Sequence, residues 1–415
     1  MSTLERLAQT AYLPRKLYLG AALTLLTSFF GLAMASETAI TARFLPDSNN
    51  PEVNNFVNTT PNSGYCVTNP GDCNWRKAFS VAVPNVTEYI PLISGQGVGF
   101  KVPNSWRELT VTHDDGTTQK VQVRIVGIGS RYNLSQSVDS ITGVNGSTHS
   151  WLWDREYVYA PAGCSYGGLG FYSQWNYTFF WGVNSDNPCA KFSRVNVSPG
   201  MFFSVINFMY EMRTPNPLDM SMGTYKGQIT YTLGPGGDFD LGGAVASDPL
   251  ITLNFTLSVQ HNLRVQFPIN ANLLALAPQG GWQQWVYNGA ANLPPKLIGN
   301  QPFQQWSSTH FKMQLQCQYA LGSDCAIQND AGTTQVPVKT MVTLPYGLRD
   351  GSNKPVNRYP LANDTPSIFH PTRYVSDERS HLHFEVDKQG VQQMVDSGGG
   401  RFRGDVTVIW DSEIY

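Results

Sequence analysis

The chain of 415 residues has room for two or three domains and for an extensive hydrophobic core. Charged residues make up only 14 % of it, well below the roughly 25 % of a typical soluble domain, whereas aromatic residues, glycine and proline are plentiful. The formal net charge of −2, without a basic run or a recognition-helix pattern, gives no indication of nucleic-acid binding. Long amphipathic helical patterns are nearly absent, so the composition predicts an all-β protein built from sandwiches with many turns.

The amino terminus has the pattern of an export signal. Basic residues come first, an apolar run extends from Leu19 to Leu32, and Ala33-Met-Ala35 forms a small-x-small cleavage site. A transmembrane anchor is the alternative, but the run is shorter than the ~20 residues that span a bilayer. We therefore predict that residues 1–35 are a signal peptide and that the mature protein begins at Ser36.

The cysteines all follow this predicted cleavage site. An even number of them in an exported chain indicates disulfides formed in an oxidising compartment. Zinc binding is disfavoured because no C-x₂-C pair is present. Many pairings are possible, and clustering along the chain favours the simplest set: Cys66–Cys73, Cys164–Cys189 and Cys317–Cys325.

Alternation of apolar and polar residues predicts the strands of a first region. Residues 129–200 are rich in glycine, tyrosine and tryptophan and are predicted to be mostly loops. Residues 201–212 are apolar at many spacings, which fits either a buried strand or a short helix. The strands are expected at Thr38–Phe44, Lys77–Val83, Arg107–His113, Gln119–Val126, Tyr225–Tyr231 and Ile251–Val259.

A second strand pattern begins at Leu263, directly after Gln260-His-Asn262. Such a short joint between two strand patterns predicts two domains placed end to end. We place the domains at residues 36–259 and 263–415, with 260–262 as the linker. Strands of the second domain are expected at Leu263–Phe267, Thr309–Ala320, Val336–Leu344, Leu382–Val386 and Asp405–Trp410.

The last of these strands places Val406, Val408 and Trp410 on one face. Its other face is also largely apolar, which is typical of a strand inside a sandwich, and an unpaired edge there would invite strand addition. Phe402–Val408 repeats the pattern of Tyr225–Tyr231, but only the earlier copy is followed by another strand. We therefore predict two β domains of related plan, the second one strand short.

No motif in the sequence indicates catalysis. Gly95-Gln-Gly-Val-Gly99 lacks the strand-then-helix context of a phosphate loop and is predicted to be a turn. His381, His383 and Glu385 alternate along one predicted strand, a spacing that metal sites can use, but no ligand from another strand can be identified. No nucleophile, zinc-protease or paired-carboxylate pattern is present. We expect no catalytic residue, no metal and no cofactor.

Arginines next to aromatic residues are the candidates for a binding site. Trp75 and Arg76 follow Cys73, Arg107 precedes a strand, and Arg213 precedes two prolines. A guanidinium binds carboxylates and stacks on aromatic rings. The alternative is that each arginine covers surface or pairs with a nearby acid, such as Asp72, Glu108 or Glu211.

The order of these features resembles a known family of pilus subunits. The resemblance rests on Trp106–Val111, Gly223–Thr230, Leu257–Pro268 and Gly404–Val408. Together these segments resemble the CblD-like pilus biogenesis initiators, the tip subunits of alternate chaperone–usher pili that include the colonisation-factor minor fimbrial subunits.

The resemblance implies two immunoglobulin-like domains in tandem, an adhesin domain at 36–259 and a pilin domain at 263–415 that lacks its final strand. A periplasmic chaperone would fill the groove beside Val406, Val408 and Trp410, and a strand of the major pilin would replace it at the outer-membrane usher. The subunit would then start the fibre and occupy its tip on the bacterial surface.

The resemblance also implies that arginines of the adhesin domain bind a host-cell glycan or glycoprotein. Arg76 matches one of them, and Arg213 lies where the family has a basic pair, although Thr214 replaces the second base. Trp75 and Arg107 complete the predicted receptor site. Two other hypotheses remain open, a structural initiator without its own receptor and a secreted carbohydrate-active enzyme.

Overall fold

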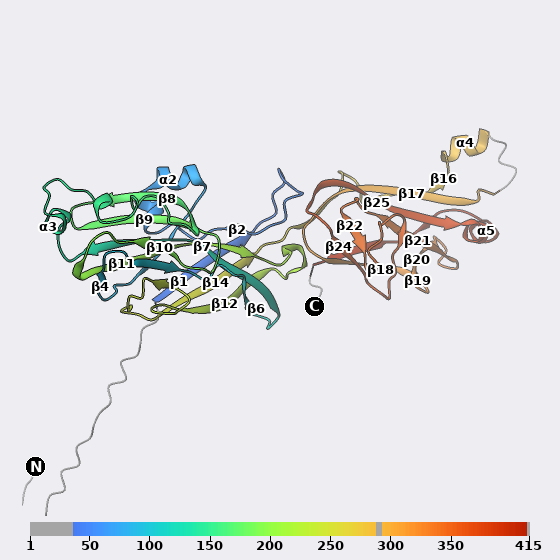
Figure 1. Ribbon diagram of the computed structural model, residues 1–415. Helices are drawn as coiled ribbons and strands as arrows, with labels where there is room; N and C mark the ends of the chain where they lie inside the picture. Colours follow the sequence, from blue (N-terminus) through green and yellow to red (C-terminus); the bar gives the residue numbers. More distant parts are fainter. Residues whose placement is uncertain (1–35, 288–292, 413–415) are drawn as a thin grey trace, which may run out of the picture. The chain divides into compact units, whose positions relative to one another are not determined.

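The structure, a computed structural model, describes residues 36–287 and 293–412. The predicted signal peptide at 1–35 lies outside the described residues. The fold is all-β, with many strands and a few short helices (Figure 1). Within the described ranges no helix is long and apolar enough to cross a bilayer.

The strands before residue 260 pair only with one another. One sheet has the order β2-β1-β14-β12-β6-β7-β11-β3, to which β4, β8 and β9 are added, and a smaller sheet has the order β10-β5-β13. Apolar residues alternate along these strands and meet in one core. The strands are β1 (Ser36–Phe44), β2 (Val57–Asn58), β3 (Val81–Pro84), β4 (Ile90–Leu92), β5 (Gly97–Lys101), β6 (Arg107–His113), β7 (Thr118–Leu134), β8 (Cys164–Tyr172), β9 (Asn176–Val183), β10 (Cys189–Phe192), β11 (Val197–Arg213), β12 (Gly223–Thr232), β13 (Asp240–Leu241) and β14 (Leu250–Val259).

Short helices connect some of these strands. Two of them, α1 and α2, are joined through Asn69 and are closed by a disulfide. The helices of this region are α1 (Tyr65–Thr68), α2 (Pro70–Arg76) and α3 (Val138–Thr142), with 3₁₀ turns at His149–Trp151 and Pro217–Asp219.

The structure corrects two predictions in this region and decides a third. The segment expected to be mostly loops contains the antiparallel hairpin of β8 and β9. The strand expected from Lys77 begins only at Val81, because α2 ends at Arg76 and Lys77 caps it with a left-handed φ of 53°. Residues 201–212 form part of the long strand β11, so the helix alternative is wrong.

The strands from Leu263 onward form two further sheets. One has the order β15-β17-β25-β21-β20-β19 with β16, β23 and β26 added, and the other has the order β22-β24-β18-β27. Their elements are β15 (Leu263–Gln266), β16 (Ala277–Pro278), α4 (Gly281–Tyr287), β17 (Lys296–Ser307), β18 (Phe311–Cys317), β19 (Tyr319–Leu321), β20 (Asp324–Asn329), β21 (Gln335–Thr343), β22 (Leu348–Asp350), β23 (Tyr359–Pro360), β24 (Ser367–Pro371), β25 (Val375–Asp387), α5 (Lys388–Asp396), β26 (Phe402–Arg403) and β27 (Val406–Asp411).

The glycine in the sequence pattern shared by Tyr225–Tyr231 and Phe402–Val408 has the same physical cause in both regions. A Cβ atom on Gly227 would lie 2.3 Å from the carbonyl oxygen of Thr110, and a Cβ atom on Gly404 would lie 2.7 Å from that of Ala326. A side chain at either position would therefore collide with the backbone of the neighbouring strand.

The three predicted disulfides are all present, Cys66–Cys73, Cys164–Cys189 and Cys317–Cys325.

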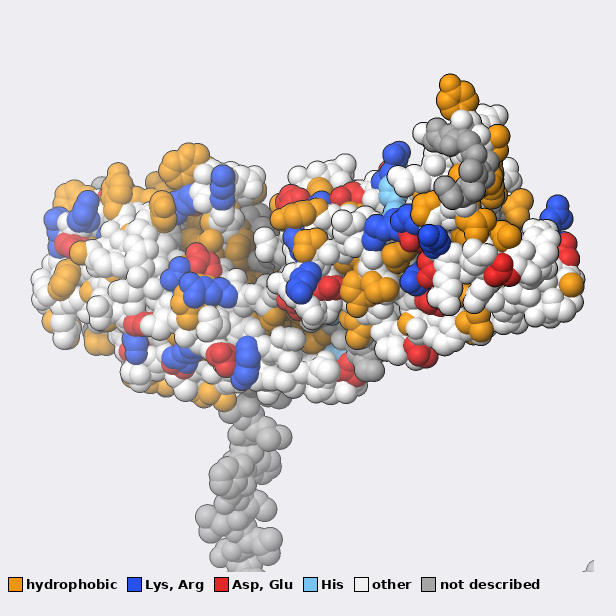
Figure 2. All heavy atoms as spheres, turned by 90° about the vertical axis from the view of Figure 1, so that its right-hand side faces the viewer, with side chains coloured by type: hydrophobic (Ala, Val, Ile, Leu, Met, Phe, Trp, Pro, Cys, Tyr) orange, Lys and Arg blue, Asp and Glu red, His pale blue; other side chains and the backbone are white. Residues whose placement is uncertain are grey.

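Hydrophobic side chains are exposed on and near α4, in the projecting part of the second region (Figure 2). Among them Tyr287 is 91 % exposed and Trp282 is 50 % exposed. The continuous segment from Phe267 to Pro295 contains no charged residue.

Candidate functional site

Strand β14 of the first region has a strand partner on both sides. It runs parallel to β1 on one side and antiparallel to β12 on the other, and all three strands lie side by side (Figure 1). The five apolar residues of its inner face are at most 1 % exposed: Ile251, Leu253, Phe255, Leu257 and Val259. Both backbone edges and the inner face of β14 are therefore removed from water.

Strands β15 and β27 lack such a neighbour. Among the described residues, β15 pairs only with β17, and β27 pairs only with β18. The structure places β27 at the edge of its sheet, as the predicted groove requires, but the apolar outer face that suggested the interior of a sandwich is not covered, since Ile409 is 42 % exposed. An edge of this kind presents unpaired backbone N–H and C=O groups.

The inner faces of both edge strands border the same hydrophobic cluster. Val408 lies opposite Leu315 and Trp410 opposite Met313, which are buried, so the inner face of β27 points into the core. These edge residues are nevertheless only half-buried, in contrast to those of β14. The half-buried residues of the two strands are Leu263, Val265, Val406, Val408 and Trp410.

Aromatic rings connect β15 to β27 at one end. The ring of Phe267, just after β15, lies 6.0 Å from that of Trp410, and both pack against Phe303. The Nε1–H of Trp410 is buried and has no acceptor among the described residues. An acceptor next to this edge would therefore remove an unfavourable unpaired donor.

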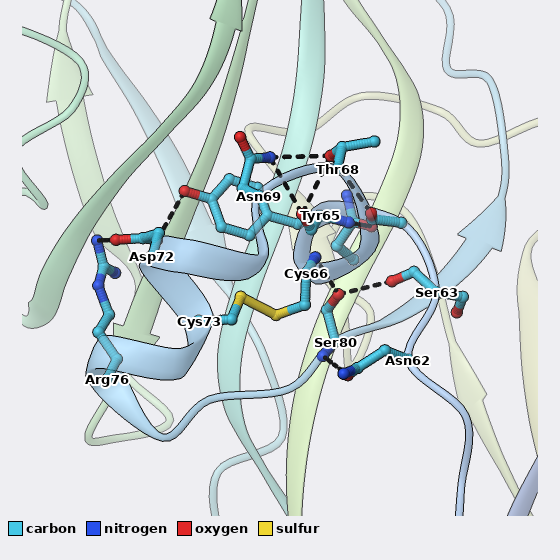
Figure 3. Close-up of a disulfide and its surroundings, with 12 residues drawn as sticks. Asn62, Ser63, Tyr65, Cys66, Thr68, Asn69, Asp72, Cys73, Arg76 and Ser80 are labelled. Carbon is cyan, nitrogen blue, oxygen red and sulfur yellow. Dashed lines mark hydrogen bonds and ion pairs between the residues drawn. A yellow bond between two sulfur atoms is a disulfide. The ribbon is translucent and has the colours of Figure 1, made fainter.

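The predicted receptor residue Arg76 lies at the end of α2 and points to Asp72 (Figure 3). Its guanidinium pairs with Asp72 at 2.8 Å and also donates to the carbonyl oxygen of Gly167. Asp72 also accepts a hydrogen bond from Tyr65 at 2.8 Å, and burial raises the pKa of Tyr65, so its hydroxyl keeps the proton that it donates. The Cys66–Cys73 disulfide fixes the loop that carries these groups. The side chain of Arg76 is consequently only 8 % exposed.

Arg213 contributes to a second arrangement on the outer face of the sheet. Its guanidinium carbon lies 4.1 Å from the ring centroid of Trp106, and that of Arg124 lies 4.7 Å from the same centroid. Arg124 pairs with Glu211 across β7 and β11 at 2.6 Å. Among the described residues no carboxylate pairs with Arg213.

Sequence reasoning missed Arg124 and named Glu211 only as a possible partner of a candidate arginine; together these two residues connect the two arginine sites. Both line one cavity together with Arg76, and Arg124 also contacts the Trp106 that holds Arg213. Arg124 follows the buried Val123 in a predicted strand, so alternation could have placed it on the outer face. Its partner on β11 could not be found, because the two residues are far apart in sequence.

Arg107 does not belong to this cluster. It lies opposite the buried Val123, so its side chain is on the other face of the sheet from Arg124. There it pairs with Asp238 and stacks on Tyr231, with its guanidinium carbon 5.1 Å from the ring centroid. Trp75 is 79 % exposed on α2, next to Arg76 in sequence.

The histidine pattern on β25 has no metal-binding geometry. Both ring nitrogens of His383 are engaged, one with Asn300 at 2.6 Å and one with Thr343 at 2.9 Å. Glu385 pairs with Lys296 and Arg358. Among the described residues, no three His, Cys, Asp or Glu side chains are grouped so that they could hold a metal ion.

Comparisons with known proteins found matches among solved structures. No protein-family model matches the sequence, and no curated protein is similar to it. One similar solved structure is a chaperone–tip adhesin complex described as vital for synergistic activation of CFA/I fimbriae biogenesis. It is 9 % identical over 92 % of this chain and 97 % of the other, with a TM-score of 0.24. Another is the CupB6 tip adhesin from Pseudomonas aeruginosa, 12 % identical over 76 % of this chain and 96 % of the other, with a TM-score of 0.26. Both TM-scores lie below 0.5, so neither similarity by itself establishes a shared role.

Proposed function

We propose that the protein is the tip subunit of a chaperone–usher pilus and that its second region accepts a β-strand from another chain. One observation carries the proposal. The inner face of β14 is fully buried between two strands, whereas β15 and β27 border a common core with half-buried residues and have no described strand between them. A strand from another chain would pair with this free backbone and cover these residues.

The proposal assigns an order to the partners. A periplasmic chaperone binds the edge first, and a strand of the major pilin replaces it at the outer-membrane usher. By analogy with β14, the pilin strand runs antiparallel to β27 and parallel to β15. The protein is exported through the periplasm to the tip of a fimbrium on the bacterial surface, and the regions divide at residues 260–262.

In this proposal the first region is an adhesin for a host-cell glycan or glycoprotein. Arg76 and Arg213 support it, because Arg124 links them on one sheet face and no carboxylate among the described residues pairs with Arg213. Trp75 is exposed and precedes Arg76 in sequence, whereas Arg107 lies on the opposite face of the sheet from Arg124. The competing reading as a carbohydrate-active enzyme needs two facing carboxylates, and Glu211 is the single acidic residue that lines the cavity.

A fused donor strand tests the acceptor site. A copy of Ile251–Val259 is joined after Tyr415 through a flexible linker, because β14 already fills the corresponding position in the first region. We expect the melting temperature of the second region to rise by several degrees, since ~1 kcal/mol shifts a domain by roughly 2–8 °C. Differential scanning calorimetry of the full chain measures this.

The control peptide carries aspartate in place of the residues that correspond to Leu253, Phe255 and Leu257. It has the same length and linker but an inner face that cannot enter an apolar groove. Equal melting curves for both fusions and the unfused chain would contradict the acceptor site. Binding of the fused protein to host cells then separates an adhesin from a purely structural initiator, since only the adhesin should bind.

A further inference from the structure

The first region contains a small cavity that combines apolar and polar groups. Its volume is about 290 Å³. It lies on the outer face of the sheet, where β11, β7 and β9 run side by side, with α2 and β8 next to it. Apolar surface comes from Val126, Phe180 and Met209, and polar groups come from Arg76, Arg124, Ser165, Asn184 and Glu211. Apolar surface and hydrogen-bonding groups are therefore both within reach of a small ligand.

Tyr166 borders this cavity in an unusual backbone conformation. Its φ is 53°, in the left-handed region that side chains other than glycine rarely adopt. It sits where the ladder between β8 and β9 shifts register, after Ser165 pairs with Gly182 and before Gly167 pairs with Trp181. Such a bulge re-aims a side chain and is common next to functional sites.

The ring of Tyr166 contributes little to the core, because the residue is 68 % exposed. Glycine at position 182 leaves room for it, since a Cβ atom there would lie 2.9 Å from Cδ2 of Tyr166. A strained backbone that presents an exposed aromatic ring beside a cavity is explained by binding rather than by folding.

The charges that line the cavity are already compensated. Arg124 pairs with Glu211, and Arg76 pairs with Asp72, which does not itself line the cavity. An anionic ligand would have to displace a carboxylate from one of these pairs. The remaining groups suit a neutral ligand that both donates and accepts hydrogen bonds, because Glu211 accepts and the arginines donate.

One donor in the wall has no partner. The side chain of Arg76 is only 8 % exposed, and its Nε–H is buried without an acceptor among the described residues. A buried donor without an acceptor is unfavourable, so the Arg76 side chain gains a hydrogen bond if it shifts to bring this donor to a ligand oxygen. We propose that the cavity binds one neutral sugar residue of a glycan, with Tyr166 against its apolar face and Arg76, Arg124 and Glu211 bonded to its hydroxyls.

This inference rests on the proposed adhesin role and names its ligand class. The test uses the full chain carrying the fused β14 copy and two immobilised probes, a lactose-terminated glycan and the same glycan capped with sialic acid. We expect binding to the neutral probe and at least tenfold weaker binding to the sialylated one. Surface plasmon resonance measures both.

Tyr166→Gly separates binding from folding, because glycine relieves the backbone strain and removes the ring. We expect at least a tenfold loss of binding to the neutral probe, with a melting temperature equal to or above that of the parent. Phe171→Ala is the matched control, because it removes another exposed ring of β8 outside the cavity. It should leave binding unchanged.

Three outcomes would overturn the assignment of the cavity. In the first, the Tyr166→Gly variant binds the neutral probe as strongly as the parent does. In the second, the parent binds the sialylated probe more strongly than the neutral one. In the third, the parent binds neither glycan. Adhesion to host cells distinguishes the two proposals. If cells bind the protein while any of these outcomes holds, the adhesin role stands and only this site is wrong. If cells do not bind it either, the adhesin role fails as well.

Discussion

The two regions of the protein differ in how far their strands are paired and buried. In the first region β14 lies between β1 and β12, and its inner face is at most 1 % exposed. In the second region β15 and β27 border a core with half-buried residues, and each has one strand partner among the described residues. The glycines of the shared pattern, Gly227 and Gly404, lie against neighbouring backbone in both.

The difference shows that the second region forms a core although β15 and β27 each have one strand partner among the described residues. Hydrophobic stabilisation scales with the apolar area removed from water, and the second region leaves part of that area uncovered along two strands. Its core is nevertheless formed, with Phe311, Met313 and Phe369 fully buried. Edge strands of this kind can pair with an added strand.

The largest expected effect comes from truncating a side chain of the inner face of β14. Leu253 is fully buried in β14, so Leu253→Ala should lower the free energy of unfolding by ~2–5 kcal/mol. Val408 is half-buried in β27, so Val408→Ala should cost ~1 kcal/mol or less in the unfused chain. Urea denaturation followed by tryptophan fluorescence measures both losses.

The same Val408→Ala variant sharpens the comparison when the β14 copy is fused. A covering strand would bury Val408 more deeply, so its truncation should then cost more than in the unfused chain. An equal cost with and without the fused strand would mean that Val408 does not face the added strand.

A smaller effect is expected from placing a charge in the groove. Val408→Lys should remove most of the several-degree gain that the fused strand gives, because the added strand would have to bury an ammonium group. Thr407→Lys on the same strand is the control, since Thr407 is exposed on the outer face. Calorimetry of both variants, with and without the fusion, gives the two gains. Loss of the gain in both variants would show that charge on β27, rather than its inner face, is responsible.

The alternation of apolar and polar residues made most strands predictable, whereas the glycines of β8 prevented prediction of the hairpin of β8 and β9. Val406, Val408 and Trp410 share a face because side chains alternate, which requires no knowledge of partners. In β8 glycines replace the alternating residues because the backbone is crowded. A Cβ atom on Gly167 would lie 1.7 Å from the carbonyl oxygen of Val158. Such a strand carries almost no periodic signal.

The candidate binding site was only partly predictable for a different reason. Arg76 and Asp72 are one helical turn apart, so their pairing could be weighed from the sequence. The contact between Arg124 and Glu211 depends on the pairing of β7 with β11, which residue spacing does not define. The edge position of β27 agrees with the predicted groove, whereas the exposure of Ile409 depends on which elements cover the outer face, and residue spacing does not define these.

The smallest predicted effect is an acid-dependent loss of stability in the first region that the groove should not influence. His149 is buried, and its Nε2–H donates to the carbonyl oxygen of Ser173 while its Nδ1 accepts from Tyr132, each at 2.6 Å. Burial raises the pKa of Tyr132, so this hydroxyl remains a donor, and burial lowers the pKa of His149 below its usual 6.5.

The unfolded chain therefore takes up a proton at His149 before the folded chain does as the pH falls. The stabilising contribution of neutral His149 is complete above about pH 6.5 and is lost as the pH decreases towards its lowered pKa. We expect His149→Gln to reduce the slope of the unfolding free energy between pH 7 and about pH 5, measured by urea denaturation. The reduction should be the same with and without the fused β14 copy, because His149 belongs to the core of the first region. A reduction that appears only in the unfused chain would mean that the groove and this core are coupled, and the comparison between the two regions would then not hold.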